Sequence, residues 1–190
     1  MSYLKTALLF FWEVMKVALL SLAIILPIRY FLVQPFYVKG ASMEPTFLDH
    51  DYLLIDEISY RWREPHRGEV IVFRYPRDPK QYFIKRVIGL PGDRVVVRDG
   101  EVWLGENGSE LKLYKESYLG EWVRTQGQTP SYLDAVLGEQ QYYVMGDNRS
   151  ASMDSRSFGP IIKREIIGRI WIRGWPFDRW TVFNTNSITI

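Results

Sequence analysis

Two residues of this chain, Ser42 and Lys85, are of the types that can carry out covalent chemistry together. Ser42 lies in the segment Gly40 to Thr46, and Lys85 lies in the segment Phe83 to Gly89. A serine hydroxyl is a weak nucleophile until a base removes its proton, and a desolvated lysine amine can act as that base. The pair therefore predicts a serine nucleophile that needs no histidine.

The rest of the residue inventory excludes several other chemistries. The chain has no cysteine, which rules out a cysteine nucleophile, a disulfide framework and a cysteine-ligated zinc. Of its two histidines, His50 lies between Asp49 and Asp51, so a Ser-His-Asp set with Ser42 is a formal alternative. We interpret His50 as part of a solvated turn and His66 as part of a surface loop.

Lys85 is flanked by apolar residues on both sides. Tyr82 to Ile84 precede it, and Val87 and Ile88 follow Arg86. In a strand, Lys85 and Arg86 point to opposite faces, so one of these cations faces the apolar side. To act as a base near neutral pH, Lys85 needs a pKa well below its ordinary value of about 10.4, which requires burial. The alternative is that Lys85 reaches water while its stem covers apolar surface.

The segment before Ser42 predicts a groove. Phe36, Val38 and Gly40 have the same parity as Ser42, so an extended approach places them on the side to which the hydroxyl points. Pro45 suits the start of a helix or turn, which leaves backbone N–H groups around Ser42 free to bind an oxyanion. The alternative is that Ser42 caps an ordinary turn.

The N-terminal segment predicts a membrane span. Residues 7–28 are apolar except for four positions, which include Glu13 and Lys16 on one helix face. A cleavable signal peptide with an apolar core at residues 17–28 is the alternative. Residues 29–36 are bulky and lack a small-x-small cleavage pattern, so we predict an uncleaved anchor over residues 1–34. The surrounding basic residues do not decide its orientation.

The remainder, residues 35–190, predicts an all-β domain of mostly antiparallel strands. Short runs rich in Val, Ile, Tyr and Phe are bounded by turn residues. Asp99-Gly100 predicts a two-residue hairpin, and the polar stretch 105–138 looks like an insertion, so we expect an inserted β and loop subdomain at about 99–143. The predicted strands are Asp51 to Ile58, Glu69 to Tyr75, Gln81 to Ile88, Arg94 to Arg98, Val102 to Leu104, Gln141 to Met145 and Ile166 to Ile172.

Composition bounds the partners. The 190 residues are 47% hydrophobic, which is enough for one ordinary domain with a sizeable core as well as an anchor. The 24 basic and 22 acidic residues nearly balance, so we expect no nucleic-acid partner. The composition does not exclude a surface that binds another class of partner.

Four segments together resemble the sequence boxes of bacterial type I signal peptidases. They are Gly40 to Thr46, Arg67 to Phe73, Lys85 to Asp93 and Gly146 to Pro160, and they occur in the order of that family behind an N-terminal anchor. The string Gly-Asp-Asn-Arg-x-x-Ser-x-Asp-Ser-Arg, which begins at Gly146, is the most specific of these motifs.

The resemblance implies a role for each matching residue. Ser42 matches the nucleophile, Lys85 the general base, and Ser152 the serine whose hydroxyl hydrogen-bonds the lysine amine and orients it. Asp154 and Arg156 match a structural ion pair near the site. Asp147, Asn148 and Arg149 match the residues that shape the turn.

The oxyanion donors match the family only in part. The Ser42 backbone N–H matches one donor. Some members supply the second donor from a serine two residues before the nucleophile, but here that position is Gly40. We expect a backbone N–H near Gly40 or an ordered water to serve instead.

The resemblance also implies the substrate and the location. The expected substrates are secretory preproteins whose signal peptides end in Ala-x-Ala-like sequences, cleaved by a single-pass enzyme of the cell membrane whose catalytic domain faces the extracytoplasmic side. We expect contact with the lipid bilayer and no metal or organic cofactor. Phe36, Val38, Met43 and Ile84 are candidates to line shallow pockets, with the substrate adding as a strand; the alternative for each is core packing.

The aromatic run from Trp171 to Trp180 suggests a second membrane contact. Trp and Tyr rings favour the headgroup level of a bilayer, where one end of the ring is apolar and the other polar. Burial in the core is the competing interpretation.

Two other functions are alternatives to this one. A self-cleaving regulator of the SOS-repressor type also uses a Ser-Lys pair, but it requires an N-terminal DNA-binding module, whereas residues 1–39 are membrane-like and the Gly146 string is foreign to that family. An anchored β-domain that only binds polypeptides is the other alternative, and it would keep its function after Ser42→Ala or Lys85→Ala.

Overall fold

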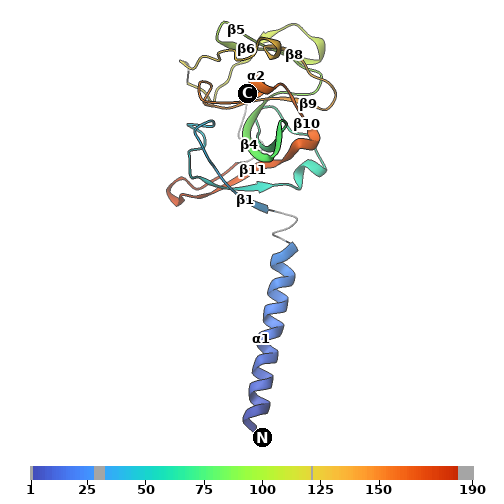
Figure 1. The fold of residues 1–190 in the computed structure, drawn as a ribbon, viewed down its shortest axis with the longest axis vertical. Helices are drawn as coiled ribbons and strands as arrows, with labels where there is room; N and C mark the ends of the chain where they lie inside the picture. The colour runs from blue at the N-terminus through green and yellow to red at the C-terminus, as the bar shows by residue number, and fades with distance from the viewer. Residues whose placement is uncertain (1, 28–32, 121, 184–190) are drawn as a thin grey trace.

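The structure is a computed structural model that describes residues 2–27, 33–120 and 122–183. Figure 1 shows a long helix joined to a compact β domain, with the smaller of two sheets at the end of the domain farther from the helix. The prediction of a mostly antiparallel β domain with one N-terminal apolar helix is confirmed.

The helix α1 spans Ser2–Pro27. It forms because residues with high helix propensity and apolar side chains run through it with no glycine and with proline only at its end. Within the described residues it is the one helix long and apolar enough to span a membrane, over Lys5–Leu26, and none of that window is covered by the rest of the chain. Lys16 Nζ donates to Glu13 Oε1 at 2.6 Å, as their three-residue spacing predicts.

The larger sheet contains eight strands in the order β1-β2-β11-β3-β4-β9-β10, with β12 paired to β11. Every pairing in it is antiparallel. Its strands are β1 (Val33–Tyr37), β2 (Tyr52–Asp56), β3 (Val70–Tyr75), β4 (Asp78–Gly89), β9 (Gln141–Met145), β10 (Ile161–Ile162), β11 (Ile166–Trp175) and β12 (Thr181–Val182).

The smaller sheet has the order β7-β6-β5-β8 and is also antiparallel. Its strands are β5 (Arg94–Arg98), β6 (Glu101–Gly105), β7 (Lys112–Leu113) and β8 (Asp134–Val136). Asp99 and Gly100 join β5 to β6 with φ values of 55° and 80°, so the predicted hairpin is confirmed. This sheet begins at residue 94, before the expected start of the subdomain near 99, while the division into an anchor over 1–34 and a domain over 35–190 stays a prediction.

The short elements lie between the strands. They are the helix α2 (Ser155–Phe158) and the 3-10 turns η2 (Ser59–Arg61), η3 (Glu106–Gly108), η4 (Pro130–Tyr132), η5 (Lys163–Glu165) and η6 (Phe177–Arg179). All seven predicted strands are present, but β4, β6 and β11 are longer than expected and β2 is shorter. The five-residue strand β1 is not among the predicted strands. Neither are the strands of two or three residues, because so short a run has no readable alternation.

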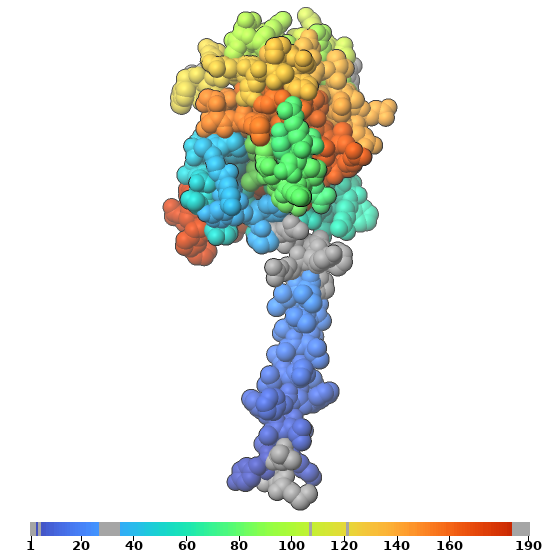
Figure 2. Space-filling view, in the orientation of Figure 1, coloured from blue at the N-terminus to red at the C-terminus, as the bar shows by residue number. Residues whose placement is uncertain are grey.

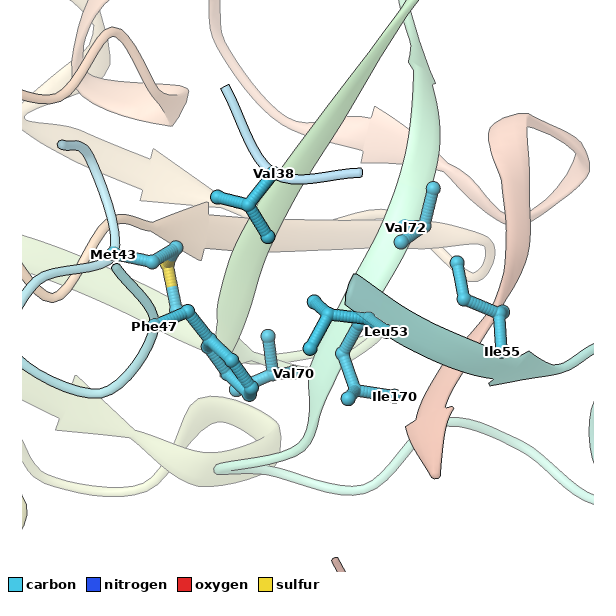
Figure 3. Packing of buried hydrophobic residues seen from close by; sticks show 8 residues of the cluster. All are labelled: Val38, Met43, Phe47, Leu53, Ile55, Val70, Val72 and Ile170. Atoms are coloured by element: carbon cyan, nitrogen blue, oxygen red, sulfur yellow. The ribbon is translucent and has the colours of Figure 1, made fainter. Parts of the chain in front are cut away.

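One apolar cluster joins the segment around Ser42 to the large sheet. Figure 3 shows its eight labelled residues, with Met43 and Phe47 beside one another. Both of these side chains are buried, and they anchor the turn that carries Ser42. The cluster consists of Val38, Met43, Phe47, Leu53, Ile55, Val70, Val72 and Ile170.

Strand register brings the segments that carry the motifs together in space. In the β3–β4 pair, Ile71 faces Lys85, and in the β4–β9 pair, Arg86 faces Met145. The residues that follow Met145 therefore leave the sheet next to the middle of β4. This places the segment that starts at Gly146 beside Lys85, although the two are far apart in sequence.

Candidate active site

Ser42 and Lys85 are in hydrogen-bond contact. Lys85 Nζ lies 2.8 Å from Ser42 Oγ and donates to the Ile84 carbonyl oxygen at 2.9 Å. Ser42 stays partly exposed, so its hydroxyl is accessible to a substrate. The distance is within the range required of a nucleophile and its base.

Lys85 is buried rather than extended into water. Only 4% of it is exposed, so the alternative in which its amine reaches solvent is wrong. Burial lowers the pKa of Lys85 from 10.5 to about 8, because the charged ammonium loses its hydration. Asp154 and Asp147 act in the opposite direction by attraction, and Arg156 lowers the pKa by repulsion. A usable share of the amine is therefore neutral near pH 7 to 8.

The Ser42 turn is held by its neighbours along the chain and by the Gly146 segment. Residues 42–46 form turns, and Phe47 N–H donates to Met43 O at 2.9 Å. Asn148 N–H donates to Ser42 O at 3.1 Å. No described residue accepts a hydrogen bond from the Ser42 N–H, so this donor can point at an oxyanion as the sequence predicts.

The expectation for Gly40 needs correction. Its φ of 90° is one that glycine adopts readily, and its backbone N–H donates to Asp49 Oδ1 at 2.8 Å. That N–H is therefore occupied and is not a free second donor to an oxyanion. The sequence does not predict this hydrogen bond, because it forms only when the turn brings the Asp49 carboxylate next to the Gly40 N–H.

Ser152 is buried near Ser42 and Lys85 but does not form the expected hydrogen bond. Its Oγ has no hydrogen-bond partner among the described residues. A Cβ built on Gly146 would lie 2.2 Å from Ser152 Oγ and 2.4 Å from Ser42 O. Gly146 thus lets Ser42 and Ser152 approach the same backbone position, and the predicted role of Ser152 as the residue that orients Lys85 stays a prediction.

Asp154 and Arg156 form the expected ion pair. Arg156 Nε and Nη2 donate to the two Asp154 oxygens at 2.9 and 2.7 Å, and both side chains are fully buried. Asp154 also accepts from Gly146 N–H at 3.1 Å. The pair therefore fixes the Gly146 segment that packs on Ser42.

A second buried pair, Arg86 with Asp147, was not anticipated. Arg86 Nε and Nη2 donate to Asp147 at 2.8 and 2.6 Å, and Thr46 Oγ1 donates to the same carboxylate at 2.5 Å. Alternation in β4 correctly separates Lys85 from Arg86, but it predicts that only one of them is buried. Both are buried, because each face of this strand is covered.

The four candidate pocket residues line one cavity of about 580 Å³, which Ser42 and Lys85 also line. Val38 and Met43 also belong to the buried apolar cluster, so each of them both lines the cavity and packs in the core. Phe36 packs edge-on against Tyr82 with ring centroids 5.5 Å apart. The full lining is Phe36, Tyr37, Val38, Lys39, Ser42, Met43, Gln81, Tyr82, Phe83, Ile84, Lys85 and Met153.

His50 lies in an exposed turn and His66 in an exposed loop, as predicted. His50 has a φ of 70°, and its ring contacts the Tyr37 hydroxyl and Asp49. His66 contacts Arg63 through Nδ1 at 2.8 Å. Neither histidine forms a hydrogen bond with Ser42 within the described part of the chain, so the Ser-His-Asp alternative has no support.

Comparison with known proteins shows the family of this chain. Residues 11–175 match the family model described as "Signal peptidase, peptidase S26". The chain is 38% identical to a probable signal peptidase I-2 of a Synechocystis strain, over 88% of this chain and 74% of the relative. It is 37% identical to signal peptidase I of Leptolyngbya laminosa, over 88% and 81% of the two chains.

Other relatives are more distant. Signal peptidase IB of Staphylococcus aureus is 33% identical, over 79% of this chain and 82% of the relative. A crystal structure of a signal peptidase I from Enterococcus faecalis aligns with a TM-score of 0.45 at 30% identity, over 56% of this chain and 97% of that one. On the family match and these identities, the chain belongs to the signal peptidase family, peptidase S26, and is a serine endopeptidase of the signal peptidase I type.

Proposed function

We propose that this chain is a membrane-anchored peptidase that cleaves signal peptides from secretory preproteins, with Ser42 as nucleophile and Lys85 as general base. The observation that carries the proposal is the 2.8 Å contact between Ser42 Oγ and a lysine amine that is almost fully buried. Family membership supplies the reaction class, which is peptide-bond hydrolysis at a signal peptide.

The proposed reaction runs through an acyl-enzyme. Ser42 Oγ attacks the carbonyl carbon of the scissile bond while neutral Lys85 takes its proton. The Ser42 N–H donates to the oxyanion that forms. The C–N bond then breaks and the Lys85 ammonium protonates the leaving amine. Lys85 next removes a proton from water, and the resulting hydroxide attacks the acyl carbon. The bond between the acyl carbon and Ser42 Oγ then breaks, the Lys85 ammonium returns the proton to Ser42 Oγ, and the signal peptide is released with a free carboxylate.

Ser152 fits this scheme through the hydrogen-bond capacity of a neutral amine. Such an amine has two N–H donors and one lone pair. In the proposed state the lone pair receives the Ser42 proton, and the Ile84 carbonyl accepts one N–H. The remaining N–H needs an acceptor, and the unpartnered Ser152 Oγ is the candidate. Ser152 would then orient Lys85 without touching the substrate.

The cavity beside Ser42 is the proposed binding site for the end of the signal peptide. Phe36, Met43 and Ile84 give it apolar walls, and we expect small side chains such as alanine to fit beside the nucleophile. Residues 36–39, at and after the end of β1, and residues 81–84 of β4 line this cavity, so we expect a substrate to add between them as a strand.

The lipid bilayer is the proposed partner of two parts of the chain. The helix α1 is the proposed span, and the domain is proposed to lie on the extracytoplasmic side. The end of β11 and η6 carry exposed rings, with Trp175 49% and Phe177 75% exposed. In Figure 2 the end of β11 and η6 are red and lie near the end of the domain from which the helix extends. These rings are proposed to rest at the headgroup level.

The test uses the full chain in detergent or lipid with a purified preprotein, and mass spectrometry to locate the cut. We expect one cut after an Ala-x-Ala-like sequence, and loss of cleavage in Ser42→Ala and Lys85→Ala. Matched controls are Ser150→Ala and Lys80→Ala, since both side chains are exposed and outside the cavity. Cleavage that persists in Ser42→Ala would refute the proposal, and binding without cleavage would favour the non-catalytic alternative.

A further inference from the structure

One stretch of the insertion, residues 114–120 and 122–129, covers the back of the Gly146 segment. Gln126 O accepts from Arg156 Nη1 at 2.8 Å, and Gln128 Nε2 donates to Ser152 O at 2.8 Å. Thr129 N–H donates to Arg156 O at 3.0 Å. This stretch therefore touches several residues that surround the catalytic pair, although none of it lines the cavity at Ser42.

Glu116 makes the strongest of these contacts. Its carboxylate accepts from both terminal nitrogens of Arg149, with Nη1 to Oε2 at 2.6 Å, and Arg149 is almost fully buried. A bidentate pair of this kind fixes both direction and distance. Asp147 adds coulombic attraction, but within the described residues Glu116 is the carboxylate that hydrogen-bonds Arg149.

Arg149 transmits this contact to the catalytic pair. Its Nε donates to Gly146 O at 3.0 Å. Gly146 is the position at which Ser42 O and Ser152 Oγ approach too closely for any side chain. A small movement of Gly146 therefore displaces Ser42 relative to Lys85, because the contact has no free space to absorb it.

Tyr118 provides a second contact between the same stretch and the residues around Ser42. Its ring lies under the Arg86 guanidinium, 3.9 Å from ring centroid to Cζ, and its hydroxyl donates to Glu116. Arg86 holds Asp147, which also binds Thr46 at the end of the Ser42 turn. Glu116 and Tyr118 thus act on Gly146 and on the Ser42 turn through two different arginines.

We propose that Glu116 is a positioning residue for the Ser42–Lys85 pair, acting through Arg149 and the Gly146 carbonyl. The inference rests on the proposed function of that pair. It gives the insertion a catalytic purpose, because the carboxylate of the insertion sets the alignment of a nucleophile that it does not touch. A displacement of about 1 Å at a reacting atom is enough to lower turnover by about a hundredfold.

The test compares Glu116→Gln with the wild-type full chain in the preprotein assay, with kcat corrected for the folded fraction. We expect kcat to fall by about tenfold to a hundredfold with KM within about twofold, since Glu116 is outside the substrate cavity. Glu110→Gln is the matched control, because Glu110 is an exposed carboxylate of the same insertion, and its kcat should equal the wild-type value.

A double variant, Glu116→Leu with Arg149→Met, separates positioning from simple stabilisation. Replacing a buried ion pair by apolar residues of similar volume commonly restores stability. We expect the urea midpoint to recover while kcat stays low, because Gly146 O has lost its donor. Recovery of both, or a folded Glu116→Gln enzyme with wild-type kcat, would overturn the inference. Failure of the wild-type chain to cleave would instead refute the proposed function.

Discussion

Replacing Lys85 by methionine should make the protein more stable, and the gain should disappear at high pH. Lys85 has a pKa of about 8 in the folded chain and 10.5 as its ordinary value, and it is almost fully buried. Below pH 8 the folded protein must hold a charged ammonium in a site that disfavours it. Methionine has a similar size and no charge, so it removes that penalty.

The magnitude follows from the difference between the two pKa values. One pKa unit corresponds to about 1.4 kcal/mol, so the penalty below pH 8 is about 3 kcal/mol. Between pH 8 and 10.5 the unfolded chain binds more protons than the folded one, and the stability of the wild type therefore rises with pH. The hydrogen bonds that Lys85 makes to Ser42 and Ile84 offset the gain by about 1 kcal/mol each, independent of pH.

The measurement is urea unfolding of both full chains in the same detergent, followed by tryptophan fluorescence at pH 7 and pH 10. We expect the stability of the methionine variant relative to the wild type to fall by about 2 to 3 kcal/mol between these values. Other titrating groups are common to both proteins and cancel in the comparison. A difference that stays constant with pH, or that grows as the pH rises, would contradict the desolvated amine at the centre of the proposed mechanism.

Three further predictions concern the same site. The value of kcat/KM should rise about tenfold per pH unit below pH 7 and level off above about pH 8, because the Lys85 amine becomes neutral over this range. A flat profile from pH 6 to 9 would exclude Lys85 as the base. Asp154→Asn should lower the free energy of unfolding by about 3 to 5 kcal/mol, because it leaves Arg156 buried without its carboxylate. The control Asp134→Asn removes a carboxylate from an exposed pair with Arg94 and should change the free energy of unfolding by about 1 kcal/mol or less. Equal losses in the two variants would argue against the buried pair. Gly146→Ala should abolish cleavage, because its Cβ would collide with Ser42 O and Ser152 Oγ. The control Gly174→Ala should remain active, because its Cβ meets nothing closer than 3.9 Å. An active Gly146→Ala enzyme would refute the tight contact at this position.

The sequence is most informative where a local pattern decides the structure. The Val-rich run of β5 and the Asp99-Gly100 turn predict the hairpin correctly, because turn geometry is set by neighbours in the chain. The pairing of Ser42 with Lys85 is predicted by residue chemistry together with the family motifs. Both predictions rest on information within a few residues of the position concerned.

The sequence is least informative where an interaction depends on register between distant segments. The Arg86–Asp147 pair exists because β4 and β9 align Arg86 with Met145, and no local signal reports that alignment. Glu116 and Arg149 come together across 33 residues and two sheets. The occupied N–H of Gly40 is a similar case, since it depends on how one turn closes.

The ion pairs around Lys85 explain how a lysine can be a base in a site rich in carboxylates. An unpaired aspartate next to Lys85 would stabilise the ammonium and raise its pKa. Here Asp154 is bound by Arg156, and Asp147 is bound by Arg86.

Each carboxylate is thus largely neutralised by an arginine, and Arg156 itself opposes the ammonium. Desolvation is then the largest influence on Lys85, and its pKa falls to about 8. In the proposed mechanism the two buried arginines would therefore favour the neutral amine as well as hold the fold, because they prevent their aspartates from restoring the charge that the proposed base must lose.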